Sequence, residues 1–309
     1  MPGQAKAEAK AEAKAEAKAK AKAEAVERYT VPRHPMITPS SIEPPVHNVS
    51  DEVRHMILPS DARPNSLTTF LLNASPQGFN LATQHPFLQH AGKGTLPKAT
   101  LSRWLSQDRL YAQSYIAFIG ALIARVDLPY EEISHKPNSL QWRIVDLLSS
   151  SLENIHRELA FFDDTAGKYG LQLDAPSDPD TTFQPVLATE QYIEIFRSFG
   201  KDPSKSLLEG MVVLWATEAC YLSAWTYASS FSTERGDDKP SSSDLDGGAL
   251  REAFIPNWTS SEFQSFVKEI AALTDLLGEQ ECVKGRELNL FGWLWLHILD
   301  TERRFWPEV

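Results

Sequence analysis

The segment from residue 85 to residue 125 constrains the fold most strongly, because it has the apolar period of one long helix. Its large apolar side chains recur at three- and four-residue steps, at Leu101, Trp104, Leu105, Tyr111, Tyr115, Phe118, Ile119 and Leu122. This spacing predicts a helix with a broad face in the core. Asp108 falls on that face. An ionised carboxylate is rarely buried alone, so Asp108 either pairs with a cation such as Arg109 or holds a polar ligand.

A second apolar stripe near the C-terminus also contains one carboxylate. Glu302 interrupts a helical run of apolar side chains at Leu288, Phe291, Leu294, Trp295, Ile298, Leu299, Phe305 and Trp306. Two carboxylates on two core helices suggest one shared pocket. Burial raises the pKa of a carboxyl, which suits a general acid or base near neutral pH. The alternative is that Glu302 pairs with Arg303, Arg304 or another cation.

A third apolar helix is expected over residues 207–227, and it contains both Glu218 and Cys220. Two residues on a helix differ by about 200° in direction, so these two side chains cannot face the same pocket. Glu218, Tyr221 and Trp225 share one face through their spacing of three and four. Cys220 then falls on another face, as a small buried apolar residue.

The order of short motifs along the chain resembles the TenA family, also called thiaminase II, of the TENA/THI/PqqC group. The motifs are HPF at residues 85–87, GxGTLP at 92–97, WLxQDxxY at 104–111 and a final-helix glutamate shortly before a Phe-Trp pair. The resemblance implies an all-α, haem-oxygenase-like multihelical bundle. It also implies that Asp108 hydrogen-bonds an aminopyrimidine ring, that Tyr111 lines the pocket and that Glu302 transfers protons.

The middle helix resembles the eukaryotic and archaeal branch of that family, which lacks the nucleophilic cysteine. The pattern E-x-x-Y-x-x-A-W at residues 218–225 places Glu218 at the position of that cysteine. The resemblance implies further substrate contacts at Tyr192, Tyr221, Trp225 and Trp258. Trp258 stands where cysteine-containing members often have a tyrosine. The segment around Glu158 also resembles the family, and we interpret it as packing with an internal ion pair.

A carboxylate is a poor nucleophile but an adequate base for activating water. The branch therefore implies hydrolysis of amino- or formylamino-methylpyrimidine to hydroxymethylpyrimidine in thiamine salvage, with Glu218 and Glu302 as catalytic residues. Two alternatives stay open. One is a non-catalytic pyrimidine-binding or regulatory protein, and the other is a thiaminase II that uses Cys220 as its nucleophile.

No cofactor or metal is expected from the sequence. His85 and His90 flank a proline turn, and we interpret them as a capping residue and a surface residue. Haem- and quinone-binding proteins share the fold implied by the resemblance, which makes His156 a conceivable axial ligand. Those relatives lack the paired QD-x-x-Y and final-helix glutamate motifs, so the sequence favours a pyrimidine site.

The 309 residues divide into a tail, residues 1–64, and one helical domain, residues 65–309. Residues 5–25 repeat Ala, Lys and Glu, which favours a solvated, partly helical tail, and residues 26–64 form a Pro-rich linker expected to be disordered. A flexible surface loop is expected over residues 233–248.

Charge and cysteine content restrict the partners. The 41 acidic residues exceed the 30 basic ones and give a net charge of -11, which disfavours nucleic acid and anionic membranes. The apolar runs at residues 115–124 and 288–299 are shorter than the roughly 18 residues of a membrane span, so neither is expected to cross a membrane. Cys220 and Cys282 show no pairing pattern, which favours a reducing, cytoplasmic location. The family resemblance implies a homo-oligomer, a dimer or tetramer, that binds a small aminopyrimidine.

Overall fold

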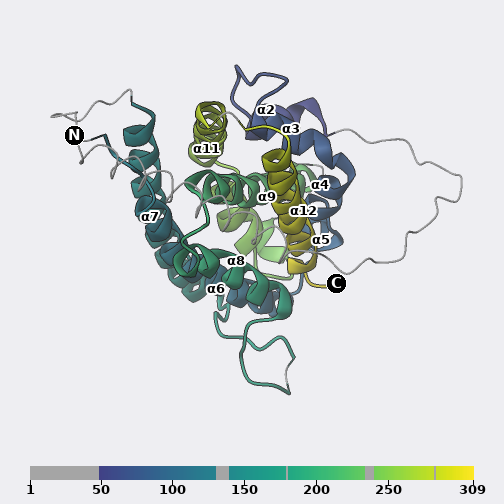
Figure 1. The fold of residues 1–309 in the computed structure, drawn as a ribbon. Helices are drawn as coiled ribbons and strands as arrows, with labels where there is room; N and C mark the ends of the chain where they lie inside the picture. The colour runs from purple at the N-terminus through teal and green to yellow at the C-terminus, as the bar shows by residue number, and fades with distance from the viewer. Residues whose placement is uncertain (1–48, 130–138, 179, 234–239, 282) are drawn as a thin grey trace, which may run out of the picture.

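The computed structural model describes residues 49–129, 139–178, 180–233, 240–281 and 283–309. Within these ranges the chain is helical and contains no strand (Figure 1). The α-helices are α2 (Asp51–Ile57), α3 (Leu67–Ala74), α4 (Pro76–Thr83), α5 (Pro86–Gly92), α6 (Lys98–Ile123), α7 (Leu140–Tyr169), α8 (Leu187–Lys201), α9 (Leu207–Thr233), α10 (Ile255–Trp258), α11 (Ser261–Gln280) and α12 (Arg286–Phe305). A 3-10 turn, η1 (Ser241–Ser243), and a π-helix, η2 (Leu250–Phe254), precede α10. The prediction of an all-α fold is confirmed.

Helix α9 lies at the centre of the bundle. It packs against α5, α11 and α12 and also against α2, α4 and α10, so little of its surface is free. Helix α5 approaches it closely, because a Cβ at Gly92 would lie 1.9 Å from the carbonyl oxygen of Ala228. Among the described helices α9 alone is long and apolar enough to cross a membrane, yet 78% of its most apolar stretch is buried inside the protein. Burial by neighbouring helices accounts for its composition without a membrane.

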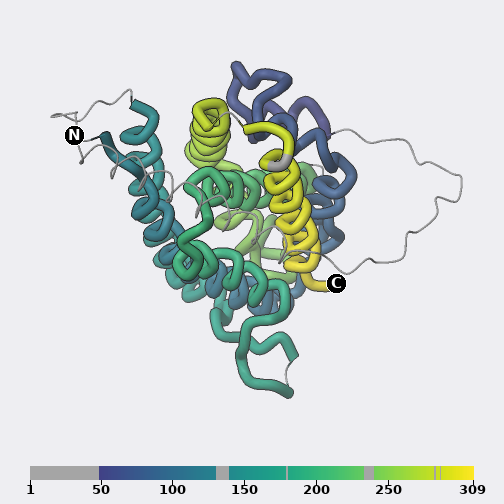
Figure 2. Tube along the Cα trace, in the orientation of Figure 1, coloured from purple at the N-terminus to yellow at the C-terminus, as the bar shows by residue number. Residues whose placement is uncertain are grey.

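The two long helices α6 and α7 pack on each other on one side of α9, and α8 packs along α6 (Figure 2). Helix α7 begins at a cap in which the Ser139 hydroxyl accepts a hydrogen bond from the Trp142 backbone N–H, and it ends at Gly170 with φ +65°. Both are standard signals for helix termini. Helix α12 closes the other side against α4, α8 and α9.

Arg125 joins the C-terminal ends of α6 and α8. Its guanidinium donates to the carbonyl oxygens of Ala121 at 2.8 Å, Asp202 at 3.0 Å and Lys205 at 3.0 Å, and also to that of Phe199. The last carbonyls of a helix have no partner within the helix, so one arginine satisfies several of them.

The packed part of the chain begins before residue 65, the boundary expected from the sequence. Helix α2 packs on α9 and α11, and Val49, Ile57 and Leu58 are buried. The Pro-rich composition nearby hid this short amphipathic segment. Residues 1–48 lie outside the described residues, as does Cys282, so the expectations about the charged tail and about that cysteine stay predictions.

Residues 240–248, expected to belong to a flexible surface loop, are anchored instead. Asp244 is buried and forms an ion pair with Arg251 at 2.6 Å. Asp246 is buried and accepts hydrogen bonds from the backbone N–H groups of Gly248 and Leu250 at 2.9 and 2.8 Å. Gly248 has φ +92°, a conformation that favours glycine. These contacts fix the start of η2 and hence the place of α10.

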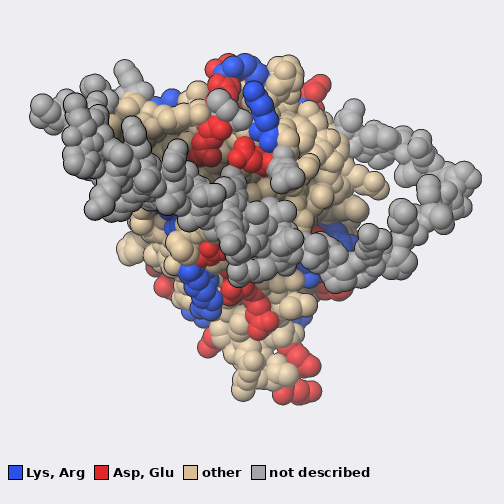
Figure 3. All heavy atoms as spheres, in the orientation of Figure 1, with Lys and Arg blue, Asp and Glu red and all other residues tan. Residues whose placement is uncertain are grey.

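Figure 3 shows Lys and Arg side chains interspersed with acidic ones over the described part of the face in view. No large basic patch appears on that part of the surface.

Candidate active site

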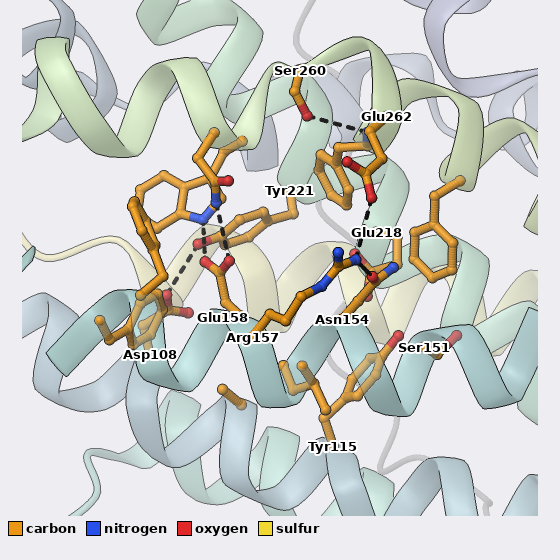
Figure 4. A pocket seen from close by; sticks show the side chains of 18 of the residues that line it. Asp108, Tyr115, Ser151, Asn154, Arg157, Glu158, Glu218, Tyr221, Ser260 and Glu262 are labelled. Carbon is orange, nitrogen blue, oxygen red and sulfur yellow. Dashed lines mark hydrogen bonds and ion pairs between the residues drawn. The ribbon is translucent and has the colours of Figure 1, made fainter. Parts of the chain in front are cut away.

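A cavity of about 320 Å³ opens among α6, α7, α9, α10 and α11 (Figure 4). Its wall combines aromatic rings with carboxyl groups. The lining carboxyl groups come from Asp108 on α6, Glu158 on α7 and Glu218 on α9, with Glu262 of α11 beside them. The volume suits a small heteroaromatic molecule.

Asp108 is buried and has a neutral hydrogen-bond donor as its partner. It is 2% exposed and accepts a hydrogen bond from the Tyr221 hydroxyl at 3.0 Å. Burial raises its pKa, and the hydrogen bond from Tyr221 partly offsets this rise. Arg109 points elsewhere, since its Nε donates to the Leu173 carbonyl oxygen at 2.8 Å and its guanidinium lies over the Phe183 ring. The structure therefore does not show the Asp108–Arg109 pair that the sequence left open.

Glu218 lines the cavity together with Tyr221, as their shared helix face predicts. Burial raises the pKa of Glu218 to about 7. A hydrogen bond with Tyr115 lowers it, and the nearby charge of Glu158 raises it further. A carboxyl with this pKa exchanges protons readily at neutral pH.

Cys220, on the same helix, is fully buried and does not line the cavity. Burial raises the pKa of its thiol, and the charge of Glu302 adds to this rise. The thiolate, the nucleophilic form of cysteine, is therefore disfavoured at this position.

Glu302 is 4% exposed and lies outside the set of residues that line the cavity. The Tyr192 hydroxyl donates a hydrogen bond to its Oε2, whereas its Oε1 has no hydrogen-bond partner among the described residues. Burial raises the pKa of Glu302 to about 7, the hydrogen bond from Tyr192 lowers it, and the charge of Glu218 raises it.

The ion-pair alternative for Glu302 is not seen either. Arg303 and Arg304 both pair with Asp300, at 3.2 and 2.5 Å. Glu302 is therefore buried beside a neutral partner, and like Glu218 it has a pKa near neutrality.

The predicted aromatic contacts divide into two layers. Tyr111, Tyr221 and Trp258 line the cavity. Trp225 is fully buried behind Trp258, with ring centroids 4.3 Å apart, and Tyr192 lies behind Tyr111, with centroids 5.1 Å apart. Helix spacing predicted the inward faces of Tyr111, Tyr221 and Trp225, and the family resemblance supplied Tyr192 and Trp258. Neither could say which rings reach the cavity.

Glu158 is the main residue of the site that the sequence interpretation missed. It was expected in packing with an internal ion pair, but it lines the cavity and accepts hydrogen bonds from Trp258 Nε1 at 2.5 Å and Asn257 Nδ2 at 3.0 Å. Its neighbour Arg157 pairs with Glu262 on α11 at 3.2 Å. The sequence did contain a sign that Glu158 faces inward. It lies three residues after Ile155 and four before Phe162, so it shares one helix face with these apolar side chains.

The three histidines that the sequence singled out, His85, His90 and His156, do not line the cavity. The His85 ring accepts a hydrogen bond from the Phe87 backbone N–H at 3.2 Å and so caps α5, and His90 contacts Thr95 at 2.8 Å. His156 is exposed and does not line the cavity. No group of three or more metal-ligating side chains occurs within the residues that the structure describes.

The fold and the cavity together define an all-helical protein with a cavity of small-molecule size lined by carboxyl groups. The profile of the TENA/THI-4/PQQC family matches residues 75–309, and the chain belongs to this family. The motifs that suggested the TenA resemblance, HPF, GxGTLP and QD-x-x-Y, all lie within that span.

Two relatives and two solved structures illustrate the range of similarity. A "Probable transcription factor" of Fusarium pseudograminearum is 33% identical over 268 residues, which cover 76% of this chain and 52% of that protein, so the chain spans about half of its length. A "Probable bifunctional TENA-E protein" of Glycine max is 19% identical over 228 residues, covering 74% of this chain and 86% of that one.

The solved structures show the fold alone. A TenA homologue from Pyrococcus furiosus has a TM-score of 0.59 at 20% identity and covers 78% of this chain and 98% of its own. A TenA family transcription regulator from Silicibacter has a TM-score of 0.58 at 13% identity and covers 78% of this chain and 94% of its own.

Proposed function

We propose that this protein hydrolyses a carbon–nitrogen bond of an aminopyrimidine, amino- or formylamino-methylpyrimidine, to yield hydroxymethylpyrimidine in thiamine salvage. One observation carries the proposal. In a chain of the TENA/THI-4/PQQC family, two buried glutamates with pKa values of about 7, Glu218 and Glu302, lie close to the buried Asp108. Such groups suit proton transfer at neutral pH, and a buried carboxylate suits recognition of N–H donors.

Recognition would depend on Asp108. The free lone pairs of its carboxylate can accept hydrogen bonds from the amino group and a protonated ring nitrogen of an aminopyrimidine. The Tyr221 hydroxyl, which donates to Asp108 Oδ2, fixes the orientation of that carboxylate. Tyr111 and Trp258 supply flat apolar surface for the ring.

Catalysis would use the two glutamates as a coupled pair. Both carboxyls have a pKa of about 7, and the charge of Glu218 raises the pKa of Glu302, so the two hold about one proton between them at neutral pH. We assign water activation to Glu218, because it lines the cavity. Glu218 takes a proton from water, a C–O bond forms and the C–N bond breaks. The leaving ammonia or formamide takes up a proton that Glu302 supplies through an intervening water or side chain, because Glu302 lies behind the cavity wall.

Cysteine-based thiamine cleavage is the first competing chemistry. It requires a thiolate facing the substrate, whereas Cys220 is fully buried, lies outside the cavity wall and has a raised pKa. These properties favour the carboxylate route.

A non-catalytic, regulatory role is the competing function of another class. The Fusarium relative is named a probable transcription factor and the Silicibacter protein a transcription regulator, which supports such a role. The net charge of -11 opposes direct binding of nucleic acid by this chain, so a regulatory role would act through pyrimidine binding.

We further propose a cytoplasmic homo-oligomer, because the cysteines show no pairing pattern and the family commonly forms tetramers.

The test offers purified protein thiamine, aminomethylpyrimidine and formylaminomethylpyrimidine separately, with chromatography for released hydroxymethylpyrimidine. Conversion of an amino- or formylamino-pyrimidine, lost in Glu302→Gln and retained in Cys220→Ala, supports the proposal. Cleavage of thiamine that disappears in Cys220→Ala refutes it in favour of the thiol. Calorimetric binding without any turnover refutes it in favour of the regulatory role.

A further inference from the structure

Helix α10 carries the Trp258 side of the cavity, yet it has little stability of its own. It has four residues, follows the π-helix η2 directly and contains Pro256, which cannot donate a backbone hydrogen bond. A single helical turn is unstable in isolation, and π-helical segments often occur beside functional sites. The orientation of Trp258 must therefore come from contacts outside α10.

Apolar packing fixes the place of the Trp258 ring. Phe254 stacks on it at 4.8 Å between centroids, Trp225 lies at 4.3 Å, and Tyr221 meets it edge-on at 5.4 Å. Such contacts are non-directional, so they do not specify where the indole N–H points. A buried indole N–H needs an acceptor, because leaving it unpaired costs free energy.

Glu158 supplies that acceptor from another helix. Its Oε1 accepts from Trp258 Nε1 at 2.5 Å, and its Oε2 accepts from Asn257 Nδ2 at 3.0 Å (Figure 4). One carboxylate on α7 thereby holds two consecutive side chains of α10. Because α7 is a 30-residue helix packed on α6 and α11, it is a firmer support than α10 itself.

We propose that Glu158 is a positioning residue of this site, which fixes the Trp258 indole and through it the wall against which the substrate ring lies. The inference rests on the proposed function for the identity of the ligand as an aminopyrimidine. It does not require Glu158 to touch the substrate. A side chain of the same shape with an uncharged acceptor at residue 158, such as glutamine, should therefore still hold the Trp258 indole in place.

The test compares Glu158→Leu, Glu158→Gln, Trp258→Phe and the double variant Glu158→Leu with Trp258→Phe. We expect KM for the pyrimidine to rise about tenfold in Glu158→Leu and in Trp258→Phe, with kcat within threefold of the parent. Glu158→Gln keeps a carbonyl oxygen for the indole and should stay within threefold in KM. The double variant should resemble either single one, because both changes break the same contact.

A control on the same helix is Glu153→Leu. Glu153 is exposed and does not line the cavity, so its KM and kcat should equal those of the parent. If the effects of Glu158→Leu and Trp258→Phe multiply in the double variant, Glu158 does not act through the indole. If Glu158→Gln is as impaired as Glu158→Leu, the charge matters rather than the acceptor. Either result overturns the proposal.

A second measurement needs no ligand. In ¹⁵N-tryptophan-labelled protein the Trp258 indole signal is assigned by its absence in Trp258→Phe. That signal should move in Glu158→Leu, remain close to the parent position in Glu158→Gln, and be unchanged in Glu153→Leu. An unmoved signal in Glu158→Leu overturns the proposal. If the parent binds and converts no pyrimidine, the proposed function fails, and this spectrum alone then decides the link between Glu158 and Trp258.

Discussion

Replacing Glu302 by glutamine should stabilise the protein at alkaline pH while it removes activity. The pKa of Glu302 rises from 4.5 to about 7 on folding, chiefly through burial. The folded protein therefore binds more protons at this group than the unfolded chain between pH 4.5 and 7, and the free energy of unfolding falls as pH rises through that window. Above pH 7 the ionised, buried carboxylate costs roughly 3 kcal/mol.

A neutral amide at residue 302 avoids this cost, and its oxygen can still accept the hydrogen bond from Tyr192. Glu302→Gln should thus exceed the parent in free energy of unfolding by roughly 3 kcal/mol at pH 8, equivalent to about 5–10 °C in Tm. The difference should shrink to below about 0.5 kcal/mol at pH 4.5, where the carboxyl of the parent is protonated in the folded state and half protonated in the unfolded chain.

The assay is urea unfolding followed by tryptophan fluorescence at several values between pH 4.5 and 8. Glu153→Gln is the control, since that glutamate is exposed on α7, and its substitution should change stability by less than about 0.5 kcal/mol at every pH. A stability gain of Glu302→Gln that is the same at pH 4.5 and pH 8, or a loss at pH 8, would refute the reasoning from burial.

Three further substitutions test the site and the fold. Asp108→Asn should weaken pyrimidine binding tenfold to hundredfold in calorimetry, because it replaces a charged acceptor by an amide; unchanged affinity would remove Asp108 from recognition. Cys220→Ala should keep turnover within about twofold and cost less than about 2 kcal/mol in stability, and a complete loss of turnover would return the thiol to the mechanism. Arg125→Met should lower the free energy of unfolding by about 1–3 kcal/mol, because it removes the donor to carbonyls at the ends of α6 and α8, with KM unchanged. A cost below the error of the urea titration would show that water replaces the guanidinium.

The sequence predicts helices α6 and α12 well, because their apolar periods are long and one carboxylate interrupts the apolar face of each. Asp108 and Glu302 stand out for that reason, and both are buried in the structure. Periodicity places a side chain on a face, however, and does not tell how many layers of side chains separate it from a cavity. Glu302, Tyr192 and Trp225 therefore lie one layer deeper than a direct contact with substrate requires.

Glu158 escaped the sequence interpretation for a different physical reason. It follows His156 and Arg157 in a strongly polar stretch, where a glutamate is most often a solvated residue. Its role depends on Trp258 and Asn257, about a hundred positions later, and the π-helix that brings them into reach has no sequence signature we could use. The anchoring of residues 240–248 by Asp244 and Asp246 is a non-local feature of the same kind.

Because α9 is enclosed by other helices on nearly every side, it divides the positions around the cavity into fixed and adjustable ones. A change in α9 near Glu218 disturbs several helix interfaces at once, and α5 approaches α9 so closely at Gly92 that no side chain fits there. The walls from α7 and α11 border the cavity and also reach the surface, as the exposed Arg157–Glu262 pair shows. A protein evolving toward a new ligand would thus keep its proton-transfer centre constant and vary the opposite wall, so differences in substrate range among such proteins should concentrate in α7 and α11.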